Sequence, residues 1–118
     1  MEVMGARFGE VWTIRGAAAS ASFAVVSDDG WNDEFPTLFV IELEHVTRPR
    51  ARAGRSVVDK RSGTVALVDR LATVHESMLA EHIGGLTKDQ MQCIADAMRE
   101  IPLDYCIRGG ARPVAAAA

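Results

Sequence analysis

The chain has 118 residues, 48% of them hydrophobic and 25% charged, which is enough for one domain with a buried core and too short for two. The net charge of -3 excludes a protein coated in basic residues. The sequence contains no apolar run long enough to span a membrane and no basic segment followed by an apolar one. We therefore expect a cytoplasmic protein without a membrane partner.

The first half of the chain consists of short apolar and alternating segments, which are typical of strands. Glu10 to Arg15 predicts a half-buried strand and Phe23 to Val26 a buried one, joined by a hairpin loop over Ala17 to Ser22. Asp28 to Gly30 has the composition of a turn, because Asp side chains bond the local backbone and Gly tolerates a positive φ. Thr37 to Leu43 predicts the next strand.

The middle of the chain is basic. The segment from Thr47 to Arg61 contains Pro49, Gly54 and six of the 13 lysines and arginines, and it predicts either a long exposed connection or a ragged edge strand. Thr64 to Asp69 predicts a further apolar strand. A short helical stretch is expected near Glu76 to Glu81.

A carboxy-terminal helix is predicted after Thr87, because Thr87 and Gln90 match a capping box. One apolar stripe follows at three- and four-residue spacing, formed by Met91, Ile94, Met98 and Ile101, and Pro102 closes the helix. Residues 108–118 are rich in Gly and Ala and predict a flexible tail. Short strands followed by one helix predict a single domain over residues 1–107, a small, mainly β barrel with a helix packed on it.

The residues that commonly bind metals show no ligand pattern. Cys93 and Cys106 have no metal-type spacing and predict free thiols. His75 and His82 lie seven residues apart without a further ligand set. We therefore expect no metal site and no cofactor.

Two segments near the amino terminus, Arg7-Phe-Gly-Glu-Val-Trp12 and Phe23-Ala-Val-Val-Ser-Asp-Asp-Gly-Trp-Asn32, resemble the amino-terminal half of the MazF/PemK/Kid toxins of bacterial toxin–antitoxin pairs. Segments 65–74 and 79–87 fit the same family, so the resemblance runs from about Arg7 to Ile101. It implies an SH3-like, partly open barrel with a C-terminal helix, a two-fold homodimer and a cognate antitoxin. Trp12 is then expected to pack in the core or at the dimer interface and not to stack on a base.

The resemblance also implies a metal-independent endoribonuclease acting on single-stranded RNA, whether mRNA, rRNA or tRNA. In this reaction the ribose 2′-hydroxyl attacks the adjacent phosphate, leaving a 2′,3′-cyclic phosphate and a 5′-hydroxyl, which requires a base, an acid and a cation. Family members commonly have an Arg-Pro pair before the second strand and a Thr-Ser pair at the end of the third. Ala21-Ser22 and Glu44-His45 stand at these positions here.

Four residues are candidates for the catalytic groups: Arg15, Glu44, His45 and Asp69. Arg15, at the other end of the same hairpin, would supply the cation. Glu44 and His45 would supply base and acid if the strand bulges or ends there, because neighbours on a strand point to opposite faces. Otherwise Glu44 is a solvated strand end and His45 a loop residue. Asp69 matches an acidic position that some Kid-like members use in cleavage, or it is a structural aspartate that binds loop amides.

The arginines of the basic segment stand two or three residues apart, so that on extended chain they present a row of forked donors suited to phosphates along a single strand. We expect them to form an RNA-binding loop, which comprises Arg48, Arg50, Arg52 and Arg55. The alternatives are a solvated basic loop and a docking site for the acidic tail of an antitoxin.

Two further functions are open. Ala21 and Glu44 favour a catalytically silent homologue that binds RNA or an antitoxin without cutting. Gyrase poisoning, as in the related CcdB toxins, is disfavoured, because those toxins typically end in Trp-Gly-Ile whereas Tyr105-Cys-Ile107 leads into a polar tail here.

Overall fold

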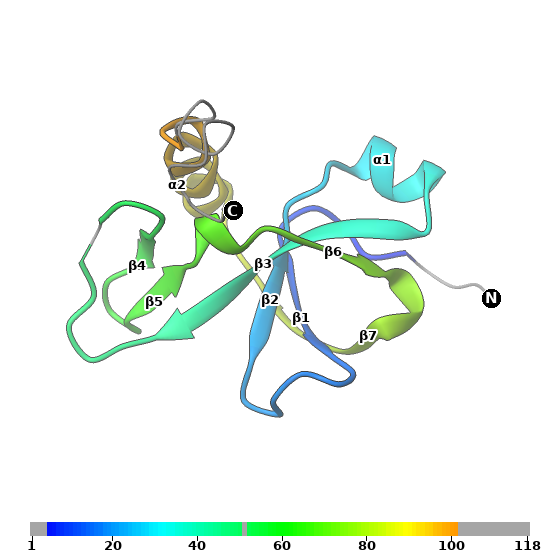
Figure 1. Ribbon diagram of the computed structural model, residues 1–118, viewed down its shortest axis with the longest axis horizontal. Helices are drawn as coiled ribbons and strands as arrows, with labels where there is room; N and C mark the ends of the chain where they lie inside the picture. The colour runs from blue at the N-terminus through cyan, green and yellow to red at the C-terminus, as the bar shows by residue number, and fades with distance from the viewer. Residues whose placement is uncertain (1–4, 51, 102–118) are drawn as a thin grey trace, which may run out of the picture.

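The computed structural model describes residues 5–50 and 52–101, and its main feature is one antiparallel sheet of seven strands (Figure 1). The strands are β1 (Glu10–Ile14), β2 (Ser22–Val25), β3 (Thr37–His45), β4 (Ser56–Asp59), β5 (Thr64–Ala66), β6 (Ala72–His75) and β7 (Leu79–Gly85). The helices are α1 (Asp29–Glu34) and α2 (Lys88–Arg99), and two 3-10 turns, η1 (Val68–Arg70) and η2 (Glu76–Met78), join the last strands. The predicted fold class, mainly β with a carboxy-terminal helix, is confirmed.

Strand β3 organises the sheet, because it pairs with different strands along its two halves. Its carboxy-terminal half, Leu43 to His45, pairs with β5, and its amino-terminal half, Thr37 to Val40, pairs with β6. The opposite edge of β3 pairs with β2 over Val40 to Leu43. The strand order is β4-β5-β3-β2-β1-β7, with β6 beside β3, so the sheet is an open one.

The core has two parts on either side of β3. The larger part lies under α2 and is formed by Val11, Ala24, Ile41, Leu43, Val58, Ala66, Val68, Met91 and Ile94. The smaller part is formed by Ala6, Val25, Leu38 and Val40, and Trp12 packs against it while stacking on the imidazole of His82. The predicted capping box is confirmed, because the Thr87 and Gln90 side chains each accept a hydrogen bond from the other residue's backbone N–H.

Several predicted elements are wrong. Asp28 to Gly30 does not form a turn, because Asp29 and Gly30 begin helix α1 and Asp28 caps it, its carboxylate accepting a hydrogen bond from the backbone N–H of Trp31. The predicted strand over Thr64 to Asp69 ends at Ala66, and Asp69 lies in η1. The helical stretch near Glu76 to Glu81 is limited to η2, because the chain pairs with β1 from Leu79 onward as β7.

The basic segment contains an edge strand. Strand β4 lies at one end of the sheet, and its residues Ser56 and Val58 are buried, with the Ser56 hydroxyl 3.3 Å from the carbonyl oxygen of Cys93 on α2. The edge-strand alternative is therefore correct for 56–59, and the residues before it are largely exposed. Pro102, Cys106, Tyr105-Cys-Ile107 and the predicted tail 108–118 lie outside the described residues. Within the described chain, no helix is long and apolar enough to cross a membrane.

Candidate nucleic-acid interface

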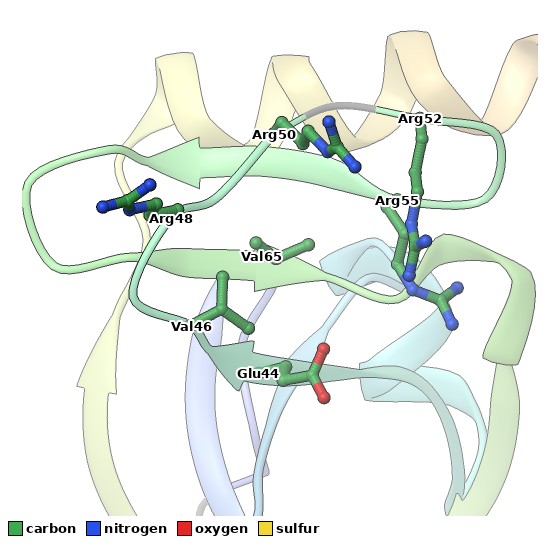
Figure 2. Close-up of a pocket in the computed structure, with 7 residues that line it drawn as sticks. All are labelled: Glu44, Val46, Arg48, Arg50, Arg52, Arg55 and Val65. Atoms are coloured by element: carbon green, nitrogen blue, oxygen red, sulfur yellow. The ribbon is translucent and has the colours of Figure 1, made fainter.

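The arginine segment, which we define as the described residues between β3 and β4 that carry Arg48, Arg50, Arg52 and Arg55, runs over β4 and β5 (Figure 2). An open groove of about 220 Å³ lies there, lined by the four arginines together with Glu44, Val46 and Val65. The segment leaves the sheet at Val46, whose backbone N–H donates to the carbonyl of Gly63 at 2.8 Å. It returns through a tight turn in which the backbone N–H of Arg55 donates to the carbonyl of Arg52 at 2.9 Å.

Three of the four arginines are available to a ligand. Arg48, Arg50 and Arg52 are exposed, and none of the hydrogen bonds or ion pairs among residues 5–50 and 52–101 engages their guanidinium groups. A guanidinium presents a planar fork of donors that matches the oxygens of a phosphate. The groove can therefore offer several such forks to a polyanion.

Arg55 differs from the other three, because it is tied to Asp69. Its side chain is only 16% exposed, and its Nη1 atom forms an ion pair with the Asp69 carboxylate and donates to the carbonyl of Gly54 at 3.0 Å. The Arg55 Nε atom is buried and finds no partner among the described residues. We call these contacts of Gly54, Arg55 and Asp69 the clasp. The two residues that the sequence suggested separately, Arg55 for RNA binding and Asp69 for catalysis, are thus brought together.

Glu44 and His45 lie on opposite faces of the sheet. Both belong to β3 and pair regularly with β5, Glu44 opposite Val65 and His45 opposite Thr64, so the strand neither bulges nor ends between them. Glu44 is exposed and lines the groove with Val65. The Nδ1 atom of His45 lies 3.1 Å from the Thr64 hydroxyl, which in turn lies 2.6 Å from the hydroxyl of Ser62. The structure therefore groups Glu44 with the arginines and His45 with two hydroxyls.

Arg15 is not among the residues that line the groove. It is exposed, follows β1, and its backbone N–H donates to the carbonyl of Met78 at 2.9 Å. Ser22, which stands where the MazF/PemK/Kid toxins that the sequence resembles have the proline of their Arg-Pro pair, is buried in β2 opposite Leu43. The cations beside Glu44 are thus those of the arginine segment.

A second polar cluster, which the sequence did not suggest, lies on β1 and β7. The Glu10 carboxylate accepts hydrogen bonds from the Trp12 indole N–H at 3.0 Å and from the backbone N–H of Arg7 at 2.8 Å, and it lies 3.8 Å from the His82 imidazole. The contacts with Arg7 and His82 join β1 to neighbouring segments, and the bond to Trp12 lies within β1. The cluster fixes Trp12 in its packed position.

Arg7 also links the chain start to α1. A hydrogen bond to Asp33, together with the charge of Asp29, raises the pKa of the Arg7 guanidinium above its ordinary value. The backbone N–H of Phe8 donates to Asp29 at 2.7 Å and lowers the pKa of that carboxyl, an effect to which Arg7 adds. These exposed groups hold the amino-terminal segment in place and do not line the groove. Among the described residues, no group of three or more His, Cys, Asp or Glu is placed to hold a metal ion.

No protein-family model matches this sequence, and no curated protein matches it. The structure, however, is similar to those of solved toxins. A mycobacterial endoribonuclease in complex with its cognate antitoxin is 16% identical, with a TM-score of 0.68 over 82% of this chain and 97% of that one. The Mycobacterium tuberculosis toxin MazF-mt6 is 16% identical, with a TM-score of 0.57 over 76% and 91% of the two chains. A MazE–MazF structure from Deinococcus radiodurans gives 16% identity, a TM-score of 0.59 and coverages of 80% and 93%. At this level of identity the comparison shows that the chain has the fold of these toxins.

Proposed function

We propose that this chain is a MazF-type toxin of a toxin–antitoxin pair and an endoribonuclease that cleaves single-stranded RNA without a metal ion. The observation that carries the proposal is the groove in which one carboxylate, that of Glu44, lies among exposed arginines. The shared fold supports it, because similar structures are described as endoribonucleases and one of them as a complex with its cognate antitoxin.

The groove can supply two of the groups that the reaction requires. In the proposed mechanism the Glu44 carboxylate accepts the proton of the ribose 2′-hydroxyl, and the 2′-oxygen attacks the adjacent phosphorus. Guanidinium groups of Arg48, Arg50 and Arg52 donate hydrogen bonds to the negative charge that develops on the phosphorane oxygens. A guanidinium does not lose its proton near neutral pH, so the departing 5′-oxygen takes its proton from water.

In this proposal His45 and Arg15 have no role in the groove, because they do not line it. The partners are a second copy of the chain and an antitoxin, and the site of action is the cytosol, where single-stranded RNA is present. The exposed apolar side chains Leu71, Met78 and Ile83 support a partner on the β6 and β7 side of the sheet, because a monomer gains by covering such surface.

One observation favours a second candidate, a silent homologue that binds RNA or an antitoxin without cutting. The position at which the related toxins have an arginine is Ala21, and one well-placed donor to a developing oxyanion lowers the barrier by roughly 3 to 4 kcal/mol. The cleavage assay below separates the two candidates, because both predict binding and only the first predicts new RNA ends.

The test is incubation of the purified protein, in the presence of a chelator, with a long RNA and with the same sequence in which the ribose 2′-hydroxyls are replaced by hydrogen. We expect cleavage of the RNA alone, with 2′,3′-cyclic phosphate and 5′-hydroxyl ends. Glu44→Gln should lower the rate by at least about 100-fold, the usual contribution of a general base. Glu34→Gln, the same change at an exposed position on α1, is the matched control and should cut at the normal rate.

If RNA binds but stays intact at high protein concentration, the result would refute the endoribonuclease and support the silent homologue. Ends that carry a 5′-phosphate, or cleavage of the 2′-deoxy substrate, would refute the mechanism even if RNA is cut. Normal cleavage by Glu44→Gln would remove Glu44 from the proton transfer.

A further inference from the structure

We propose that Asp69 is a positioning residue, which through Arg55 holds the arginine segment in the shape of a phosphate path. The inference rests on the proposed function, because it assigns the segment to RNA. It places Asp69 and Arg55 outside direct contact with RNA and leaves Arg48, Arg50 and Arg52 as the residues that touch phosphate.

Two hydrogen bonds of the clasp share one acceptor, the carbonyl of Gly54. The carbonyl of Gly54 accepts hydrogen bonds from Arg55 Nη1 at 3.0 Å and from the backbone N–H of Asp69 at 3.4 Å. The Asp69 carboxylate completes the ring through its ion pair with Arg55. Gly54 has a φ of +77°, and a Cβ placed on it would lie 2.9 Å from Asp69 Cγ. Only glycine fits there, so the segment and η1 touch without an intervening side chain.

The clasp acts on the arginines through the backbone. Arg52 and Arg55 form the two ends of a tight turn, with backbone hydrogen bonds of 2.9 and 3.4 Å in the two directions. Fixing Arg55 and Gly54 therefore fixes the backbone of Arg52. The other end of the segment is fixed at Val46 by its bond to Gly63. Because η1 also contributes the buried side chain of Val68 to the main core, Asp69 ties the turn to a rigid part of the molecule.

Removing the charge of Asp69 should change the affinity for RNA in opposite directions, depending on whether Arg55 binds phosphate or only positions the segment. If Arg55 itself bound phosphate, Asp69 would compete for it, and removing the Asp69 charge would strengthen RNA binding. If the clasp positions the segment, removing that charge releases the turn, and RNA must then order a mobile loop on binding, which weakens the apparent affinity. The number of phosphates neutralised does not change in that case, so the salt dependence of binding stays the same.

The experiment compares the full-length wild-type chain with Asp69→Asn and Arg55→Gln, both of which break the ion pair. The matched control is Asp96→Asn, which breaks an ion pair of the same kind with Arg99 on the exposed side of α2. Two quantities are measured for each protein: the affinity for a fluorescent oligoribonucleotide as a function of salt, and the hydrogen exchange of peptides covering residues 47–55 in the free protein.

We expect Asp69→Asn and Arg55→Gln to weaken binding by about fivefold, which corresponds to the upper end of what an ion pair near the surface contributes. The slope of log affinity against log salt should equal that of the wild type in both variants. Exchange in 47–55 should be faster in both and unchanged in Asp96→Asn. Normal exchange in the rest of the chain, measured without RNA, shows that the variants are folded.

Tighter RNA binding by Asp69→Asn, with a steeper salt slope, would overturn the inference in favour of a phosphate-binding Arg55. A shallower slope in Arg55→Gln would do the same. Normal binding by Asp69→Asn together with loss of cleavage would make Asp69 a catalytic residue and overturn its positioning role. If neither the wild type nor any variant binds RNA, the proposed function fails. Unchanged exchange in 47–55 in Asp69→Asn and Arg55→Gln would show separately that the clasp does not order the segment.

Discussion

Replacing Arg48, Arg50 and Arg52 together by glutamine tests the proposed nucleic-acid interface most directly. These three arginines are exposed and make no ion pair within the described chain, so their charges are available to phosphates and contribute little to the fold. Glutamine keeps a polar side chain and removes the charge. Arg55 is left in place, because its loss would also break the clasp.

The size of the effect follows from counterion release. On a single strand each phosphate contact contributes about 0.7 to the slope of log affinity against log salt. Three lost contacts should therefore lower the slope by about 2, so that between roughly 50 and 200 mM salt the wild type loses about 20-fold more affinity than the variant. The free energy of unfolding should change by less than about 0.5 kcal/mol, as is usual for exposed positions.

Fluorescence anisotropy with a labelled oligoribonucleotide at several salt concentrations measures the slope. The matched control is a triple variant with the same loss of charge at exposed positions away from the groove, Arg15→Gln, Lys88→Gln and Arg99→Gln. A groove variant whose slope equals that of the wild type would refute the phosphate path. Equal losses in both triple variants would show a general charge effect with no defined site. Normal RNA binding with lost antitoxin binding would support the docking alternative.

Three further outcomes are expected. Ile94→Ala should lower the free energy of unfolding by about 2 to 4 kcal/mol, because Ile94 is only 1% exposed under α2, whereas the exposed Cys93→Ala should have little effect in the same chemical denaturation. Light scattering at micromolar concentration should give about twice the chain mass of 12.7 kDa, and a single-chain mass would contradict the dimer. Asp29→Asn should destabilise the protein at neutral pH by less than about 1 kcal/mol. Because the pKa of Asp29 is lowered in the folded state, the difference from wild type should shrink as the pH falls through that pKa, and a constant gap in pH-dependent unfolding would contradict the bond to Phe8.

The sequence predicts the parts of the fold that depend on local chemistry. The capping box at Thr87 and the apolar stripe through Met91 and Ile94 require only neighbouring residues, and both are present in α2. The β1–β2 hairpin is local in the same sense. Strand β7 is different, because Leu79 to Gly85 is exposed along most of its length and its backbone is satisfied by β1, which lies far away in the sequence. Tertiary pairing there overrides a weak helical pattern.

The candidate site was predictable in its charges but not in their connections. The spacing of the arginines identifies a basic segment, and the two-residue period of a strand already separates Glu44 from His45. The length of β3 beyond Leu43 was not visible, and it is this extension that keeps the two residues on opposite faces. The clasp joins Arg55 to Asp69 across 14 residues through a turn and a 3-10 element, and no local pattern indicates such a contact. Only the folded structure shows that one of the four arginines, Arg55, is already paired with a carboxylate.

The regular pairing of β3 with β5 constrains how this fold can perform the proposed chemistry. A base and an acid on adjacent strand residues cannot reach the same phosphate, so the catalytic groups must come from one face of the sheet. The groove face has the carboxylate of Glu44 and three exposed guanidinium groups, whereas the other face has the imidazole of His45, which is hydrogen-bonded to the Thr64 hydroxyl. Negative charge that develops on a phosphorane is stabilised by cations beside it, and the cations gathered around Glu44 are the arginines of the groove. The proposed reaction would therefore take place on the arginine side of β3, where Glu44 and the basic segment meet.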